Sequence, residues 1–384
     1  MANSPTPAPG LLDGIRVVDL TAIVFGPYAT QVMADMGADV IKIEPPEGDA
    51  YRYASPGPER GLSGVFVNVN RGKRSVVLDL RGDEGKAALR KLIATADVFI
   101  HSMRGAAIAR LGFDYEAVRA IRPDIVYVNC YGYSRRGPKR DLPAYDDTIQ
   151  ADCGIAALQQ QITGEPGFVA TIMADKVSAQ TALWSTFAAL FHRERTGEGQ
   201  EVEVGMFETM AGFVLAEHAN GRLFSPPLGP AAYHRVVSPN RKPYRTSDGW
   251  IAALIYNDRH WAKFVEAVEP EWADEGLATL EQRAARVHEV YGNLAQTFAT
   301  RTTAEWIELL QGLGIPVAPI NTPDDLFEDE HLNAIGFFET VASDYGDITF
   351  PGMPSWFSAG QGRVAGPCPR LGEHTDEVLA ELED

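Results

Sequence analysis

Short runs of β-forming residues alternate with helical segments from about residue 14 onward. The β-type runs are at residues 15–20, 39–44, 75–80, 97–100 and 125–129, and helices are expected at 27–36, 83–96 and 114–121. Gly37 ends the first helix, and Pro45 with Pro46 stops the second strand. Strands separated by helices of this length imply βαβ crossovers. The pattern therefore predicts an α/β fold with a mainly parallel, twisted sheet.

The turn after the first predicted strand tests whether this sheet binds a dinucleotide. Residues 21–27 read Thr-Ala-Ile-Val-Phe-Gly-Pro and lack the G-x-G-x-x-G fingerprint. Those glycines let the backbone approach a pyrophosphate closely. We therefore expect a Rossmann-like topology without a nicotinamide cofactor, which argues against a dehydrogenase.

The chain of 384 residues is long enough for two domains. We predict a flexible N-terminal arm at 1–10, a large Rossmann-like domain at 11–203 and a linker helix at 204–225. A smaller α+β domain at 226–330 is predicted from a hairpin pattern at 241–254 that turns through Ser247, Asp248 and Gly249. Residues 331–384 are rich in proline and are predicted to return to the large domain as an extended segment.

Composition excludes several classes of protein. The formal net charge of −18 argues against nucleic-acid binding, which needs a basic face. No apolar run reaches the roughly 18 residues of a membrane span, and the proline-rich start lacks the features of a signal peptide. The three cysteines are odd in number and far apart, so they predict neither a disulfide framework nor a zinc site. We expect a cytoplasmic protein without a bound metal.

Asp175 stands at the start of a long apolar helix, expected from Val177 to about His192. An aspartate in this place is most simply a helix N-cap, because its carboxylate accepts the free N–H groups of the first turn. The segment around it nevertheless makes Asp175 a candidate for chemistry.

A second local feature is basic. Residues 70–75 read Asn-Arg-Gly-Lys-Arg-Ser in an otherwise acidic chain. Such a group of charges is often only a solvated turn, but it could also meet the phosphates of a polyanionic ligand.

Together these motifs resemble the class III CoA-transferases, the family of formyl-CoA transferase and carnitine CoA-transferase. The resemblance runs from about Leu12 to Gly221 and continues more weakly to His374. Its ordered motifs are Asp19-Leu20-Thr21 with Gly26-Pro27, residues 41–49, the basic residues 70–75, and Asp175 followed by Arg195-Thr196-Gly197-Glu198-Gly199-Gln200.

The resemblance implies a covalent mechanism for Asp175. In this family the aspartate attacks an acyl-CoA thioester, forms a mixed anhydride and then an aspartyl-CoA thioester, and finally passes CoA to an acceptor acid. An acyl-CoA, with succinyl-CoA as a candidate donor, and a carboxylic acid are then the only substrates, and no cofactor is permanently bound. The resemblance also implies ring-like subunits in an interlocked homodimer.

The resemblance further implies which residues bind CoA. Arg71, Lys73 and Arg74 would meet the phosphates, and the turn after the first strand would line the pantetheine. The full implied set is Ala22, Ile23, Val24, Phe25, Arg71, Lys73, Arg74, Arg104, Tyr133 and Met206. Formyl-CoA transferase has a His and a Gln where this chain has Ala22 and Val24, which argues against formate and oxalate as substrates.

Two alternatives remain open. An α-methylacyl-CoA racemase of the same superfamily would need two bases, and its relatives carry Gly-His-Asp where this chain reads Ala144-Tyr145-Asp146. A tyrosine with an ordinary pKa near 10 is a poor base. A non-catalytic acyl-CoA-binding protein would not need Asp175. A serine hydrolase is not indicated, because the chain has no Gly-x-Ser-x-Gly elbow.

Overall fold

The computed structural model describes residues 10–383, so the predicted arm at 1–10 lies almost wholly outside the described residues. The described chain forms two compact units. The larger unit contains the residues up to Cys153, Ala170–Phe213 and the residues from Glu330 onward, and the smaller one contains Gly154–Val169 and Val214–Asp329. The smaller unit thus includes Gly154–Val169, a segment that interrupts the larger unit in the sequence. The predicted domains, with boundaries at 203 and 226, place this segment in the large domain.

A six-stranded parallel sheet organises the larger unit, with strand order β3-β2-β1-β4-β5-β6. The order reverses between β1 and β4, as in doubly wound dinucleotide-binding folds. The strands are β1 (Arg16–Leu20), β2 (Asp39–Glu44), β3 (Arg74–Val77), β4 (Val98–His101), β5 (Val126–Tyr131) and β6 (Gln200–Gly205). The prediction of an α/β fold with a parallel sheet is confirmed.

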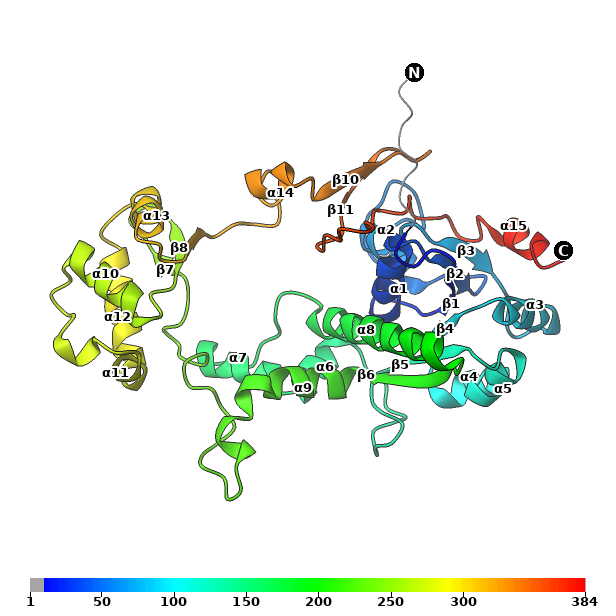
Figure 1. Ribbon diagram of the computed structural model, residues 1–384, viewed down its shortest axis with the longest axis horizontal. Coiled ribbons are helices and arrows are strands. Elements are labelled where there is room, and N and C mark those ends of the chain that lie inside the picture. Colours follow the sequence, from blue (N-terminus) through cyan, green and yellow to red (C-terminus); the bar gives the residue numbers. More distant parts are fainter. Residues whose placement is uncertain (1–9, 384) are drawn as a thin grey trace. The chain divides into compact units, whose positions relative to one another are not determined.

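Helices cover both faces of this sheet. On one face α1 packs against the long α8, which also contacts β5 and β6 (Figure 1). On the other face, α3, α4 and α5 join a core that includes Val18, Ile41 and Phe99. The helices are α1 (Phe25–Asp35), α2 (Gly64–Asn70), α3 (Asp83–Ala94), α4 (Gly105–Leu111), α5 (Tyr115–Ile121), α6 (Asp146–Asp152), α8 (Met173–Thr196) and α9 (Met206–His218), with a 3₁₀ turn η1 at Ala50–Tyr53.

Two predicted boundaries in the larger unit are wrong. The third strand was expected to reach Leu80 but ends at Val77, and the chain then turns away from the sheet. The linker helix was predicted to begin at residue 204, whereas Gln200–Gly205 forms the edge strand β6 and the helix begins at Met206. Val202 and Val204 alternate there with glutamates, which is the period of a half-buried strand.

The C-terminal segment belongs to the larger unit. Its helix α14 (Glu330–Ala334) precedes an antiparallel pair, β10 (Phe338–Val341) and β11 (Ile348–Pro351). The last helix, α15 (Thr375–Ala380), contacts β3, and its Val378 is fully buried in the core beside the sheet. The return of this segment to the larger unit was expected, but its hairpin and last helix were not.

The smaller unit has its own core. An antiparallel sheet of β7 (Tyr244–Arg245), β8 (Trp250–Ala253) and β9 (Val317–Pro319) packs with helices around Trp306, Phe264 and Phe298. The predicted hairpin at 241–254 is confirmed. The remaining elements are α7 (Ile155–Thr163), η2 (Asn220–Leu223), α10 (Asp258–Val268), η3 (Glu275–Leu277), α11 (Leu280–Ala285), α12 (Val287–Phe298) and α13 (Thr303–Gly312).

Candidate active site

A cavity of about 350 Å³ lies in the larger unit where the strand order reverses. Turns that follow β1, β4 and β5 line it, as expected for the carboxyl ends of parallel strands at a switch point. The cavity brings together seven of the predicted site residues, namely Ala22, Ile23, Phe25, Arg104, Tyr133, Asp175 and Met206. Residues that were not predicted also line it, among them Ser102, Cys130, Tyr131, Arg140 and Tyr145.

Asp175 lies in the first turn of α8 and is 7% exposed. It is not the N-cap, because Ile172 holds that position and makes no side-chain cap. Burial and, after it, the charge of Asp146 raise the pKa of Asp175 to about 7, although a hydrogen bond from the Phe25 N–H acts in the opposite direction. A carboxylate held at this pKa is poorly solvated yet still ionised in part at neutral pH, which suits a nucleophile.

Asp146 is a second buried carboxylate beside the candidate nucleophile. Its Oδ1 accepts the Asp175 N–H at 3.1 Å, and its Oδ2 accepts Gln150 Nε2. In the sequence, Asp146 was considered only in the comparison of Ala144-Tyr145-Asp146 with the Gly-His-Asp motif of the racemases, and its contact with Asp175 was not predicted. The two aspartates are 29 residues apart, and no local pattern indicates that they meet.

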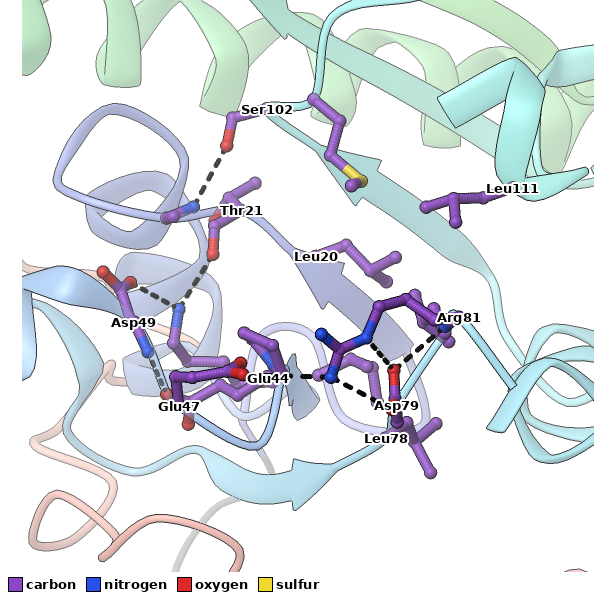
Figure 2. Close-up of a pocket in the computed structure, with 16 residues that line it drawn as sticks. Leu20, Thr21, Glu44, Glu47, Asp49, Leu78, Asp79, Arg81, Ser102 and Leu111 are labelled. Atoms are coloured by element: carbon purple, nitrogen blue, oxygen red, sulfur yellow. Dashed lines mark hydrogen bonds and ion pairs between the residues drawn. The ribbon is translucent and has the colours of Figure 1, made fainter. Parts of the chain in front are cut away.

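The turn after β1 has a strained backbone. Ile23 adopts a φ of 71°, which is unfavourable for a β-branched residue. Its N–H donates to the carboxylate of Asp49 at 3.2 Å, and Lys42 Nζ donates to the same carboxylate at 3.0 Å and to the Thr21 carbonyl oxygen at 2.8 Å. On the other side the Ala22 N–H donates to Ser102 Oγ at 3.0 Å (Figure 2). These bonds hold the turn beside Asp175.

One predicted residue of this turn does not line the cavity. Val24 is buried, with 1% exposure, and it faces a different hollow formed with α2 and the segment near Met353. The inward positions of the turn are therefore Ala22, Ile23 and Phe25.

The basic residues predicted to meet phosphates are engaged elsewhere. Lys73 is buried, and its Nζ donates to Asp19, to the Pro27 carbonyl oxygen and to Asn70. Because an ammonium has three donors, none remains for a ligand. Burial lowers the pKa of Lys73 to about 8.

The two arginines of the same loop are also in ion pairs. Arg71 is buried and pairs with Asp35 at 2.7 Å, and Arg74 pairs with Asp39 at 2.7 Å and with Glu381. None of the three basic residues lines the cavity around Asp175 or the one next to it. The geometry therefore supports a structural role for this loop, which ties helix α1, the sheet and the C-terminal segment together.

A second cavity of about 480 Å³ adjoins the first, because Ala22 and Ser102 line both (Figure 2). Its walls come from the ends of β1, β2 and β4 and from the segment that leaves β3. Arg81 stands at its edge, 2.8 Å from Asp79, with its side chain 72% exposed. Sequence reasoning missed this segment, residues 78–81, because it assigned most of it to the strand.

Within residues 10–383, no helix is long and apolar enough to cross a membrane. The same residues hold no group of three or more His, Cys, Asp or Glu side chains that could bind a metal ion.

The fold and cavity define an α/β protein with a desolvated carboxylate at the switch point of its sheet. The chain belongs to CoA-transferase family III and is an enzyme of that family: the family's model matches residues 12–375. This confirms the family resemblance drawn from the sequence.

Relatives match over almost the full length. The succinate–glutarate CoA-transferase of Agrobacterium fabrum is 33% identical over 100% of this chain and 98% of its own length. The succinyl-CoA:mesaconate CoA-transferase of Haloarcula hispanica is 32% identical over 97% of this chain and 96% of its own. The crystal structure of the D175A mutant of Rv3272 from Mycobacterium tuberculosis is 28% identical, with a TM-score of 0.85 over 97% of this chain and 99% of that one.

Proposed function

We propose that this enzyme moves CoA from succinyl-CoA to a dicarboxylic acid through covalent intermediates on Asp175. The observation that carries the proposal is the poorly solvated Asp175 carboxylate in a cavity that adjoins a second, larger one. Three relatives support the choice of substrates, since their names give succinate, glutarate and mesaconate.

The first half of the reaction loads CoA onto Asp175. A carboxylate oxygen attacks the thioester carbonyl carbon of succinyl-CoA, the carbon–sulfur bond breaks, and the CoA thiolate leaves. The thiolate then attacks the Asp175 carbonyl of the mixed anhydride, so succinate departs and an aspartyl-CoA thioester remains. This divides a difficult exchange between two weak nucleophiles into activated steps.

The second half is the reverse with a new acid. The acceptor carboxylate attacks the aspartyl-CoA carbonyl and expels the thiolate, which gives a second mixed anhydride. The thiolate attacks the acyl carbonyl of the acceptor, and the new acyl-CoA leaves with Asp175 free. The Phe25 N–H, which already bonds to the Asp175 carboxylate, is the donor placed to stabilise negative charge on that group.

The adjoining cavity suits the rest of the CoA molecule. CoA is long, and its nucleotide end must lie well away from the reacting carbonyl. The two cavities share Ala22 and Ser102, so a single extended ligand can occupy both. Arg81 is an exposed cation of the second cavity, and its ion pairs with Asp79 and Glu47 lie at the surface, where a phosphate can replace them. We assign to Arg81 the phosphate contact that the family resemblance implies for Arg71, Lys73 and Arg74.

We further propose that two subunits form an interlocked homodimer, as the family resemblance implies. Light scattering at several protein concentrations tests this, because an interlocked dimer keeps twice the chain mass on dilution.

A borohydride trap tests the covalent route. The protein is incubated with succinyl-CoA, reduced and digested, and the mass of the peptide that contains Asp175 is measured. Reduction of an aspartyl-CoA thioester leaves an alcohol at this residue, and Asp175→Asn serves as the control that cannot be trapped. An unmodified Asp175 in an enzyme that still forms glutaryl-CoA from glutarate would overturn the proposed mechanism.

A further inference from the structure

The smaller unit contains a cavity of its own, about 390 Å³ in volume. Its floor is part of that unit's core, because Tyr244, Val290 and Leu294 are each at most 6% exposed. Its rim carries Leu254, Tyr256 and Leu280, which are 39–41% exposed. The volume lies within the roughly 300–1,000 Å³ typical of small-molecule sites.

The lining combines aromatic and apolar side chains with the polar side chains of Asn220, His234, Arg235 and Arg283. Tyr233, Tyr244, Tyr256 and Tyr291 contribute four rings. Rings of this kind hold planar ligands by stacking or edge-to-face contact. The cavity around Asp175 shares no lining residue with this one.

Two arginines line the cavity, and they differ in what they bind. Arg283 is buried and saturated: it pairs with Asp258 at 2.7 Å and donates to the carbonyl oxygens of Leu277, Ala278 and Tyr256. Arg235 is only partly buried. Its guanidinium lies 5.0 Å from the centre of the Tyr256 ring and hydrogen-bonds to Tyr233 and Tyr291. Among residues 10–383 no carboxylate forms an ion pair with Arg235.

This combination restricts the chemistry of a ligand. A guanidinium has five N–H donors, so Arg235 keeps donors for a planar carboxylate beside its bonds to Tyr233 and Tyr291. A ligand with a second carboxylate would leave one charge buried without a partner, which is costly. An apolar body, by contrast, would remove the exposed rim residues from water.

We propose that this cavity is a second ligand site, one that binds an organic monocarboxylate with an aromatic body. The carboxylate pairs with Arg235 and the ring lies among the tyrosines. This site goes beyond the proposed transfer reaction and does not depend on it.

Calorimetric titration of the full-length protein tests the proposal with three probes. Phenylacetate carries the ring and one carboxylate, phenylacetamide has the same shape without the charge, and glutarate has two carboxylates without a ring. We expect saturable binding of phenylacetate and at least about tenfold weaker binding of phenylacetamide, since a charge-assisted pair is worth more than that factor. Glutarate should not compete with phenylacetate in the Asp175→Asn variant.

Variants locate the site. Arg235→Gln should weaken phenylacetate binding about tenfold, whereas Arg241→Gln, a nearby exposed arginine outside the lining, should leave it unchanged. Tyr256→Leu keeps the apolar volume but removes the ring, so it should weaken binding by a smaller factor. Equal melting temperatures would show that all three variants are folded.

Three results would overturn the proposal. The first is no heat of binding with phenylacetate at millimolar concentration. The second is equal affinity for phenylacetate and its amide. The third is unchanged binding in Arg235→Gln together with lost binding in Asp175→Asn, which would place the ligand in the other cavity.

Discussion

At the scale of single residues, two carboxylates decide the electrostatics of the candidate active site. Asp175 and Asp146 are both buried, and burial together with the neighbouring charge keeps the pKa of Asp175 about 7. Only the Phe25 N–H acts in the opposite direction. The nucleophile is therefore held in a state that costs folding free energy, and this cost can be measured.

The first prediction concerns stability and pH. A carboxyl group whose pKa is higher in the folded than in the unfolded chain stabilises the fold below its unfolded pKa, and this contribution is lost as the pH rises through the folded value. For Asp175 the loss should run from about pH 4 to pH 7. Asp175→Asn removes the ionisable group and with it this loss of stability. The variant's free energy of unfolding should therefore rise progressively above that of the wild type between these pH values and exceed it by a constant margin at higher pH. Chemical denaturation at several pH values measures the difference, and a margin that does not change with pH would contradict the prediction.

The second prediction concerns the neighbour. Asp146→Asn keeps an acceptor for the Asp175 N–H but removes the like charge, so the pKa of Asp175 should fall. The pH at which kcat/KM reaches half its maximum should move down by about one unit. The matched control is Asp147→Asn, because Asp147 is exposed and should leave the profile in place. An unshifted profile in Asp146→Asn would remove Asp146 from the site's electrostatics.

At the scale of elements, the turn between β1 and α1 is the part of the site under strain. Ile23 has a positive φ, and the buried Lys42–Asp49 pair holds its N–H. A non-glycine residue in this region costs on the order of 1–3 kcal/mol. The surrounding hydrogen bonds therefore keep the turn in a conformation that it would not adopt alone.

The third prediction follows from this strain. Asp49→Asn should lower kcat/KM, because it weakens the hold on Ile23 and moves the turn away from Asp175. Adding Ile23→Gly should restore part of the lost activity, since glycine adopts a positive φ without strain. Ile23→Ala in the same background is the control, because it shortens the side chain yet keeps the backbone cost. Equal kcat/KM in the two double variants, Asp49→Asn with Ile23→Gly and Asp49→Asn with Ile23→Ala, would mean that backbone strain at residue 23 does not affect activity.

The fourth prediction separates the two basic segments. Arg81→Gln should raise KM for succinyl-CoA about tenfold with an unchanged melting temperature, because an exposed cation loses a phosphate contact. Arg71→Gln should leave that KM unchanged but lower the free energy of unfolding by about 3–5 kcal/mol, since it leaves Asp35 buried without its partner. Steady-state kinetics and thermal melts measure both. A raised KM in Arg71→Gln together with an unchanged KM in Arg81→Gln would instead support the phosphate contact first predicted for Arg71.

At the scale of the whole molecule, the larger unit is assembled from three separated stretches of chain. The last stretch completes the unit: Val378 fills the core beside the sheet, and Glu381 pairs with Arg16 and Arg74. The site near Asp175 thus depends on residues about two hundred positions further along the chain.

The fifth prediction tests this dependence. Val378→Asp places a charge in the core and should destabilise the larger unit by several kcal/mol, so that activity is lost on mild heating. Ala380→Asp, on the exposed side of the same helix, should change little. Circular dichroism during heating distinguishes the variants. Equal melting temperatures would show that the last helix is not needed for the fold.

The sequence by itself determined the class of fold, the family and the candidate nucleophile. These follow from local signals: the alternation of strands and helices, the missing glycine fingerprint after Leu20, and the ordered motifs that end at Asp175. Such signals extend over a few residues, so they can be read without coordinates.

Only the tertiary structure decided the partners of these residues. Asp146 meets Asp175 across 29 positions, Arg71 meets Asp35 across 36, and Lys73 meets Asp19 across 54. The charges of the basic loop are visible in the sequence, whereas the buried acidic side chains that pair with Arg71 and Lys73 are identified only in the structure. The end of β3 at Val77 likewise depends on where the chain leaves the sheet, and that turn forms the cavity at Arg81. Burial and long-range pairing arise when distant segments pack, and no local pattern records them.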